Sequence, residues 1–258
     1  MKIAVLYICT GKYNQFFEGF YKSAEEFFLN GLAEKEYYVF TDNMNLSDAY
    51  NVHLYERKCQ GFPMDSLFRF DMFLSIENEI KKCDYAFFFN SNMLFVAPVG
   101  VEFLPRNRDF SAVRHPGLYK TWAPLLPYER NKKSNAYIAP YEKNYRYYMG
   151  SLNGGKAEAF VEFARCCSKW THDDFNRGII ACVHDESHLN KYMRDVDGED
   201  LSPEYAVPEG WKTPFVPKII ILDKTKKDPY FNKGRKKTFS DKIRKMYVAI
   251  RRVIIWYF

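Results

Sequence analysis

Residues 84–95, DYAFFFNSNMLF, contain a continuous apolar run that stops at the polar triplet Asn90-Ser91-Asn92. A short apolar run bounded by polar residues is typical of a strand that is buried on both faces of a sheet. Ligands of open α/β sheets bind at the carboxyl ends of such strands. The triplet is therefore a candidate ligand-binding turn, and it offers two neutral amides and no charge.

Strand and helix patterns alternate on either side of this stretch. Apolar runs predict strands at 2–9, 36–42, 51–57 and 84–89, and helical spacing of apolar residues predicts helices at 16–28 and 66–83. This alternation predicts an α/β fold with a mostly parallel central sheet. Three strand ends then carry candidate chemistry: residues 9–13, 90–92 and 223–224.

The second half of the chain is less regular. It contains a turn-rich segment at 114–130, the glycine-bearing YYMGSLNGG at 147–155, two predicted helices at 156–170 and 185–195, and a late predicted strand at 216–223. There is no internal repeat and no Gly/Ser linker. We therefore predict one catalytic domain over residues 1–224 and a tail over 225–258.

Composition and charge separate the body from this tail. Of the 258 residues, 47% are apolar and 18% are aromatic, which excludes a disordered or fibrous chain and allows one domain with a sizeable core. The formal net charge is +6, but residues 224–258 alone carry +10, so the rest of the chain is about −4. The basic pI reflects the tail, and we expect no nucleic-acid partner.

The cysteines and the first residues indicate a cytoplasmic protein. None of the six cysteines forms a CxxC pair, so we predict reduced thiols. The start, MKIAVLYICTGKY, has no long apolar region followed by a cleavage site, which favours a first strand over a signal peptide. No stretch reaches the roughly 18 apolar residues expected of a membrane span.

Six motifs in a fixed order carry a family resemblance. They are YYVFTD (37–42), HPG (115–117), YER (128–130), YYMGSLNGG (147–155), HDESHLNKY (184–192) and LSPEY (201–205). Together, over residues 2–224, the chain resembles glycosyltransferase family 6, which includes the ABO histo-blood-group transferases and the α-1,3-galactosyltransferases. The resemblance implies a GT-A type fold. It also implies transfer of galactose or N-acetylgalactosamine from UDP to the 3-hydroxyl of a galactoside, with retention of configuration.

The resemblance places the catalytic carboxylate in HDESHLNKY. Glu186 is implied as the nucleophile or as the electrostatic partner of an oxocarbenium-like transition state. Asp185 is implied as a partner of donor-sugar hydroxyls, and Asn190, one turn later, as an orienting residue. From the residues alone, acids at a helix start are also explained by the helix dipole. His184 and His188 share a helix face, but the H-E-x-x-H zinc pattern is absent because Asp185 follows the first histidine.

The implied donor site draws on several segments. Small residues in 147–155 allow a sugar to approach the backbone, although a plain tight turn is an alternative explanation. In the family, the positions of Met149 and Ser151 govern the 2-substituent of the donor sugar, and this pair favours galactose. The full set implied for the donor is Ile8, Cys9, Thr10, Tyr13, Arg69, Asn90, Ser91, Asn92, Met149, Gly150, Ser151, Asp185 and Lys224.

The acceptor galactoside is implied to face His115, Tyr119 and Glu129. Val183 stands where mammalian relatives carry a tryptophan that touches the acceptor. This departure leaves open which galactoside is bound and whether it must be fucosylated.

Asn90-Ser91-Asn92 aligns with the Asp-x-Asp metal motif of the family. Divalent sites on diphosphates use one or two carboxylates, whereas asparagine offers no charge. Bacterial relatives with Asn-x-Asn are taken to work without metal, so we expect no metal and no cofactor. Lys224 aligns with a lysine that can neutralise the leaving UDP, and a solvated tail charge is the alternative explanation.

The tail carries apolar residues at helical spacing over 239–258, with arginines and lysines between them. A basic amphipathic helix suits an anionic membrane surface, and docking on the protein body is the alternative. We expect a peripheral protein on the inner face of a cytoplasmic membrane. A silent glycan-binding module and a hydrolase with paired carboxylates are the alternative functions, and the sequence does not indicate the oligomeric state.

Overall fold

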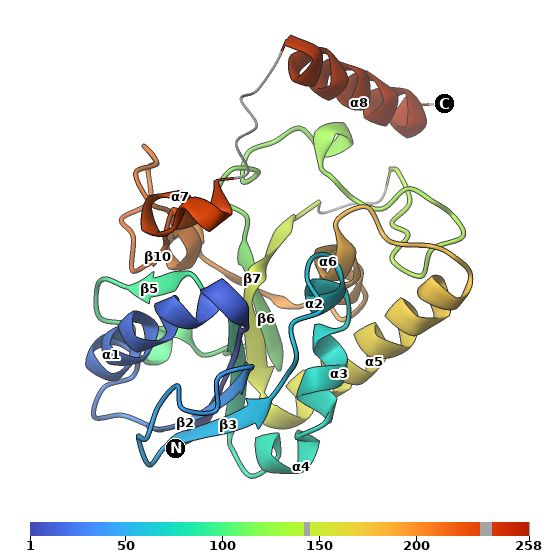
Figure 1. Cartoon of the computed structure of the whole chain (residues 1–258). Helices are drawn as coiled ribbons and strands as arrows, with labels where there is room; N and C mark the ends of the chain where they lie inside the picture. The colour runs from blue at the N-terminus through green and yellow to red at the C-terminus, as the bar shows by residue number, and fades with distance from the viewer. Residues whose placement is uncertain (142–144, 233–238, 258) are drawn as a thin grey trace.

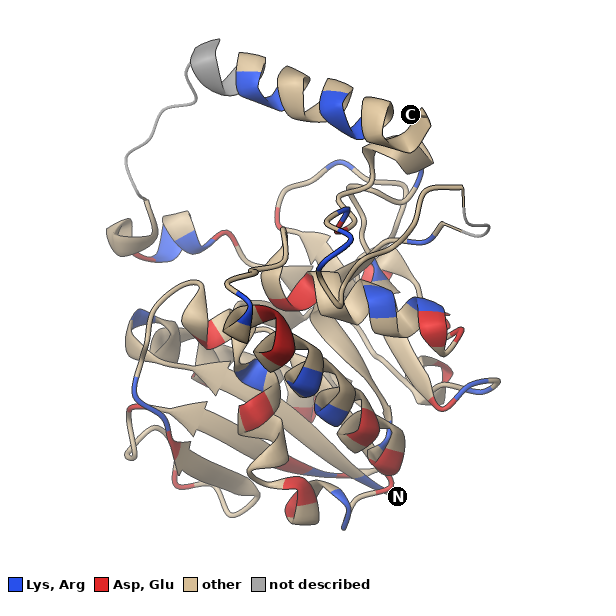
Figure 2. Ribbon diagram, turned by 90° about the vertical axis from the view of Figure 1, so that its right-hand side faces the viewer, with Lys and Arg blue, Asp and Glu red and all other residues tan. Residues whose placement is uncertain are grey.

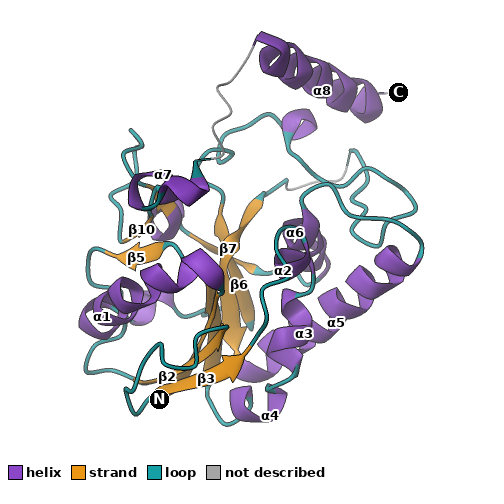
Figure 3. Cartoon of the chain, viewed as in Figure 1, coloured by secondary structure: helices purple, strands orange, loops and turns teal. Residues whose placement is uncertain are grey.

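The computed structural model describes residues 1–141, 145–232 and 239–257, with the backbone alone for 239–242. A seven-stranded sheet forms its centre, in the order β3-β2-β1-β4-β7-β6-β8 (Figures 1 and 3). Every strand of this sheet except β7 runs in one direction. The predicted α/β fold with a mostly parallel sheet is confirmed. The strands of this sheet are β1 (Lys2–Cys9), β2 (Glu34–Thr41), β3 (Val52–Glu56), β4 (Tyr85–Phe89), β6 (Phe110–Arg114), β7 (Tyr148–Lys156) and β8 (Glu199–Leu201).

A second, three-stranded sheet lies beside the carboxyl end of β4, in the order β5-β10-β9. Its strands are β5 (Met93–Phe95), β9 (Val207–Pro208) and β10 (Ile219–Ile221). The predicted late strand at 216–223 is thus shorter than expected, and it belongs to this small sheet. β5 follows the polar triplet and pairs antiparallel with β10, which brings the 223–224 region back to the triplet.

Helices cover both faces of the large sheet (Figure 1). On one face, Phe20 of α1 and Phe28, the residue after α1, pack against Tyr7 of β1 and Phe89 of β4. On the other face, α3 and α5 meet over β4, where Phe73 contacts both Phe88 and Phe160. The helices are α1 (Phe17–Phe27), α2 (Met64–Leu67), α3 (Arg69–Leu74), α4 (Glu77–Ile80), α5 (Ala157–Asn176), α6 (His184–Asp195), α7 (Lys224–Lys227) and α8 (Phe239–Tyr257), with 3-10 turns η1 (Gly11–Phe16), η2 (Val101–Phe103), η3 (Ala123–Leu125), η4 (Pro203–Ala206) and η5 (Pro229–Phe231).

Two local expectations are wrong. The segment 66–83, expected as one helix, is divided among α2, α3 and α4. The alternative of a tight turn at 147–155 is also wrong, because most of this segment is the central strand β7. The glycines are there for close packing: a Cβ on Gly154 would lie 2.3 Å from the Ala86 carbonyl oxygen, and one on Gly155 would lie 2.1 Å from that of Asp109.

The C-terminal helix α8 packs on the segment that includes η3, away from the large sheet (Figures 1 and 2). Arg252 donates to the Leu125 carbonyl oxygen at 3.2 Å, and Trp256 is buried. Both the amphipathic helix and its docking on the body are therefore present. The division into a domain over 1–224 and a tail stays a prediction.

Candidate active site

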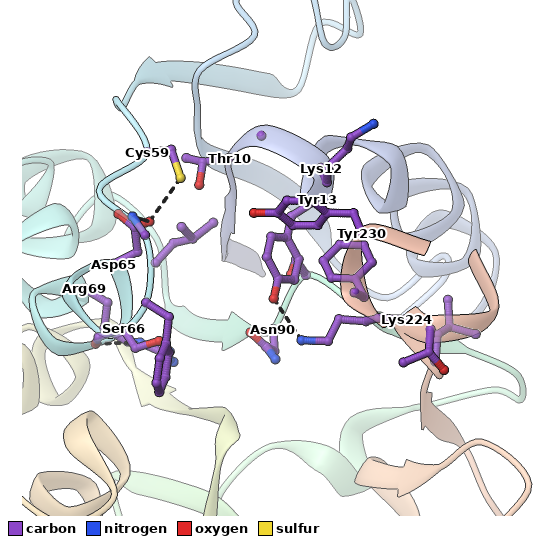
Figure 4. Close-up of a pocket in the computed structure, with 18 of the residues that line it drawn as sticks. Thr10, Lys12, Tyr13, Cys59, Asp65, Ser66, Arg69, Asn90, Lys224 and Tyr230 are labelled. Atoms are coloured by element: carbon purple, nitrogen blue, oxygen red, sulfur yellow. Dashed lines mark hydrogen bonds between the residues drawn. The ribbon is translucent and has the colours of Figure 1, made fainter. Parts of the chain in front are cut away.

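A cavity of about 670 Å³ lies at the carboxyl ends of β1 and β4 (Figure 4). The segment after β1 and the segment around α7 form one side of it, and the segment leading into α3 forms the other. Of the predicted donor-binding residues, seven line the cavity: Ile8, Thr10, Tyr13, Arg69, Asn90, Ser91 and Lys224. Residues from three distant parts of the sequence thus meet where open α/β sheets bind ligands.

Lys224 sits among aromatic rings at the cavity wall. Its Nζ donates a 2.9 Å hydrogen bond to the Tyr13 hydroxyl and lies 4.8 Å from the centre of the Tyr13 ring and 5.6 Å from that of Phe231 (Figure 4). Cation–π contacts of this kind hold an ammonium group in place. The neighbouring Lys226 instead forms an exposed ion pair with Glu209 at 2.9 Å. Lys224 is therefore a positioned cation, and Lys226 does not line the cavity.

The two asparagines of the triplet have different environments. Asn90 lines the cavity and donates to the Asn92 side-chain oxygen at 3.2 Å. Asn92 is buried, does not line the cavity, and exchanges hydrogen bonds with the Leu222 backbone, both at 2.8 Å. Asn92 thus fixes the chain two residues before Lys224. The amides bond one another and Leu222, and they offer no charge to a divalent metal.

Glu186 lies in the first turn of α6 and faces β7. Its Oε1 accepts a 2.6 Å hydrogen bond from the Tyr147 hydroxyl, and its Oε2 accepts a 2.7 Å bond from the Gly150 backbone N–H. Burial raises the pKa of Glu186 to about 7. The negative charge of Asp185 acts in the same direction, while the two hydrogen bonds and Arg69 act against it. The two hydrogen bonds thus fix the position of the Glu186 carboxylate, and a pKa of about 7 means that it titrates near neutral pH.

Arg69 connects this carboxylate region to the cavity. One of its Nη atoms lies 3.2 Å from Asp185 Oδ2 and 3.2 Å from the Gly150 carbonyl oxygen, while its guanidinium lies 4.7 Å above the Phe88 ring. Burial raises the pKa of Asp185, and Arg69 opposes that shift. Asp185 and Glu186 do not themselves line the cavity, but Arg69 does, so they flank its wall.

Asn190 holds α6 against β7. Its side chain exchanges hydrogen bonds with the Tyr148 backbone at 2.9 Å and donates to the Glu186 carbonyl oxygen at 2.8 Å. No contact between this amide and the Glu186 carboxylate is recorded among the described residues. Asn190 therefore orients Glu186 through the backbone.

The two histidines of HDESHLNKY separate into different environments. His188 is buried and lies 3.6 Å from Asp174. His184 has a left-handed φ of 50° and packs edge-on against Phe62, with ring centres 4.9 Å apart. Within the described part of the chain, no group of three or more His, Cys, Asp or Glu side chains is arranged to hold a metal.

The remaining predicted donor residues lie in or beside the core. Cys9 is fully buried, and Met149 packs against the α1-side core. Ser151 is buried next to the triplet: its carbonyl oxygen accepts from Asn90 N–H at 2.8 Å, and its hydroxyl has no hydrogen-bond partner among the described residues. None of these three lines the cavity.

The predicted acceptor residues lie outside the cavity lining as well. Burial lowers the pKa of His115, whose Nδ1 accepts a hydrogen bond from the Gly117 N–H. The Arg114 guanidinium lies 5.2 Å from the centre of the Tyr119 ring. Val183 caps α6 and donates its N–H to Ser187. Glu129 is buried, and its two carboxylate oxygens accept from the Asn131 and Cys182 N–H groups, both at 2.7 Å. Glu129 therefore connects the segment at 129–131 to Cys182, just before α6.

Part of the cavity was not predicted. The segment before α3 supplies Cys59, Gly61, Phe62, Asp65 and Ser66, and the segment after α7 supplies Tyr230 and Phe231. The aromatic residues beside proline in GFPMD (61–65) and DPYF (228–231) were the available signal, since exposed aromatics next to turn residues are unusual outside binding surfaces.

Comparisons with known proteins agree with this geometry. A sequence-family model described as "Glycosyltransferase family 6" matches residues 1–231. The chain belongs to glycosyltransferase family 6, and its sheet and helices are those of a GT-A type domain. It is therefore a glycosyltransferase.

Relatives from bacteria and mammals are similar along most of the chain. The chain is 36% identical to the O-antigen biosynthesis glycosyltransferase WbnI of Escherichia coli over 90% of this chain and 99% of the relative. It is 32% identical to the human globoside alpha-1,3-N-acetylgalactosaminyltransferase 1 over 88% of this chain and 67% of the relative. It is also 32% identical to the rat histo-blood group ABO system transferase 2 over 79% of this chain and 62% of the relative.

Tyr147→Phe is expected to move the pH dependence of transfer. Its hydroxyl stabilises ionised Glu186, so its removal should raise the pKa of Glu186 above its present value of about 7. Only the ionised carboxylate can act, so kcat/KM should rise with pH through about 7 in the wild type and at higher pH in the variant. Tyr21→Phe on α1 is the control, because that hydroxyl bonds the Asn51 side chain instead. Superimposable profiles for all three proteins would contradict the assignment.

Proposed function

We propose that this chain transfers galactose, or N-acetylgalactosamine, from a UDP-sugar to the 3-hydroxyl of a galactoside acceptor, with retention of configuration and without a divalent metal. The acceptor class is a blood-group-like or lipopolysaccharide-type glycan. The name of WbnI supports a lipopolysaccharide-type glycan, and that of the rat relative supports a blood-group-like glycan. The name of the human relative supports an α-1,3 linkage.

The observation that carries the proposal is the held carboxylate of Glu186. Retention requires a carboxylate at the anomeric carbon, as a nucleophile or as the partner of an oxocarbenium-like transition state. Two hydrogen bonds fix Glu186, and Arg69 links its neighbour Asp185 to the cavity wall. We assign Asp185 and Arg69 to the donor-sugar hydroxyls.

We assign to Lys224 the role of stabilising the negative charge that develops on the leaving UDP. Its ammonium group faces the cavity that Tyr13 and Asn90 also line. Tyr13 offers a ring for the uracil, and Asn90 offers an amide to the diphosphate without the repulsion that an unpaired carboxylate would cause.

The side chains at two positions favour galactose over N-acetylgalactosamine as the donor sugar. Met149 and Ser151 are larger than the pairs that admit an N-acetyl group in the family, although serine exceeds glycine only slightly.

Turnover with UDP-galactose and UDP-N-acetylgalactosamine, each on fucosylated and plain galactosides, tests this function. The expected product is an α-1,3-linked sugar, assigned by NMR. Donor hydrolysis without transfer would instead indicate a hydrolase. No turnover on any acceptor, with UDP still bound, would indicate a glycan-binding module.

We also propose that α8 binds an anionic membrane surface, where lipid-linked glycans would be a local pool of acceptor. No helix among the described residues is long and apolar enough to cross a bilayer. Ile243, Met246, Tyr247, Ile250 and Ile254 are all exposed on one stripe of α8. Arg244 and Arg251 are exposed beside this stripe, and this combination suits anionic headgroups. Figure 2 shows Lys and Arg along α8.

Vesicle sedimentation tests the membrane surface. The wild type should sediment with vesicles containing phosphatidylglycerol and much less with neutral vesicles. Ile250→Asp should weaken binding because it places a charge in the apolar stripe. Lys169→Ala on α5 changes charge away from the stripe and is the matched control. Equal binding of wild type and Ile250→Asp would rule the proposal out.

A further inference from the structure

A row of aromatic rings in contact connects the docked face of α8 to Glu186. Trp256 is 7% exposed, although most of its helix is exposed, and its ring centre lies 4.7 Å from that of Tyr145. Tyr145 lies 5.8 Å from Tyr128, which lies 5.4 Å from Tyr147. The Tyr147 hydroxyl bonds Glu186.

Two arginine side chains contact the same aromatic rings. The Arg130 guanidinium lies 5.0 Å from the Trp256 ring and 5.5 Å from the Tyr128 ring. Arg194, on the helix that carries Glu186, lies 5.2 Å from the Tyr145 ring. Stacked rings and cations of this kind form a rigid contact between α8, the 128–147 region and α6.

We infer that Trp256 is a positioning residue of the transfer reaction, which holds the Tyr147 hydroxyl at Glu186 through Tyr145 and Tyr128. Trp256 buries a large side chain against Tyr145, so its removal leaves a void that the three tyrosines would relax into. Relaxation of Tyr147 by even a fraction of an ångström weakens a 2.6 Å hydrogen bond to the catalytic carboxylate. The inference rests on the proposed role of Glu186.

The kinetic test compares Trp256→Ala with Val248→Ala, an exposed position on the same helix that lies outside the membrane-facing stripe. Couplings carried by packed side chains change rates by about 2- to 30-fold, so we expect kcat to fall about tenfold in Trp256→Ala, with the KM for the UDP-sugar unchanged. Trp256→Phe should restore most of the rate, and Val248→Ala should match the wild type. A wild-type kcat in Trp256→Ala would overturn the inference.

A double-mutant cycle with Tyr147→Phe shows whether the effect passes through Tyr147. If it does, Trp256→Ala should cost much less in the Tyr147→Phe background than in the wild type. Full additivity would overturn the inference, because Trp256 would then act by another route.

Hydrogen exchange gives a readout that needs no catalysis. In the full-length chain, amides of residues 145–150 should exchange faster in Trp256→Ala than in Val248→Ala. Equal exchange would overturn the positioning role. If exchange changes as expected while Glu186→Gln stays active, the proposed role of Glu186 fails instead.

Discussion

Glu186→Gln is expected to reduce transfer by roughly a thousandfold or more while UDP binding stays at the wild-type level. The amide has nearly the same shape as the carboxylate and can still accept from the Gly150 N–H, while the Tyr147 hydroxyl can accept from the new amide group. The substitution therefore removes the negative charge with little change in packing. UDP affinity should persist because Glu186 does not line the cavity.

The measurement is the initial rate of transfer together with calorimetric UDP binding on the same preparation. Glu158→Gln, at an exposed site on α5, is the matched control and should behave as the wild type. Transfer by Glu186→Gln within tenfold of the wild type would remove Glu186 from the mechanism. Loss of UDP binding in this variant would mean that the site had collapsed.

Lys224→Ala is expected to lower kcat about 100- to 1000-fold, the range seen when one preorganised partner of developing charge is removed. The ammonium group is fixed by the Tyr13 hydroxyl and two aromatic rings, so its contribution is made without reorganisation during the reaction. UDP should also bind more weakly, because both the product and the transition state carry the diphosphate charge.

The control for Lys224→Ala is Lys226→Ala, which removes the same charge from an exposed ion pair two residues away. Exposed pairs contribute little, so this variant should lose less than twofold in rate. If the two variants are equally active, the charge of Lys224 is a general property of the basic tail and is not part of the site.

Local patterns predicted the parts of this fold that depend on neighbours in sequence. The apolar runs predicted β1, β2, β3 and β4 to within two residues, and helical spacing predicted α1 and α6. The break at Phe68 between α2 and α3 was missed because apolar spacing continues across it.

Features that depend on distant segments were less predictable. The burial of Asn92 depends on Leu222, 130 residues later, and the cavity wall at Phe62 and Phe231 depends on how two surface segments return to β1. The burial of Trp256 likewise requires Tyr145, which no local pattern connects to α8. The resemblance supplied Glu186, but the hydrogen bond from Tyr147 that holds it was visible only in the structure.

The central proposal is that Asn90 and Lys224 stand in for a metal at the diphosphate, while Asn92 fixes the chain just before Lys224. The most direct measurement is the wild-type transfer rate after exhaustive dialysis against EDTA, compared with the rate in saturating Mn²⁺. We expect equal rates within about twofold, because the fixed ammonium group of Lys224 neutralises the charge on the leaving diphosphate. Complete loss of transfer in EDTA, with recovery on adding Mn²⁺, would contradict it.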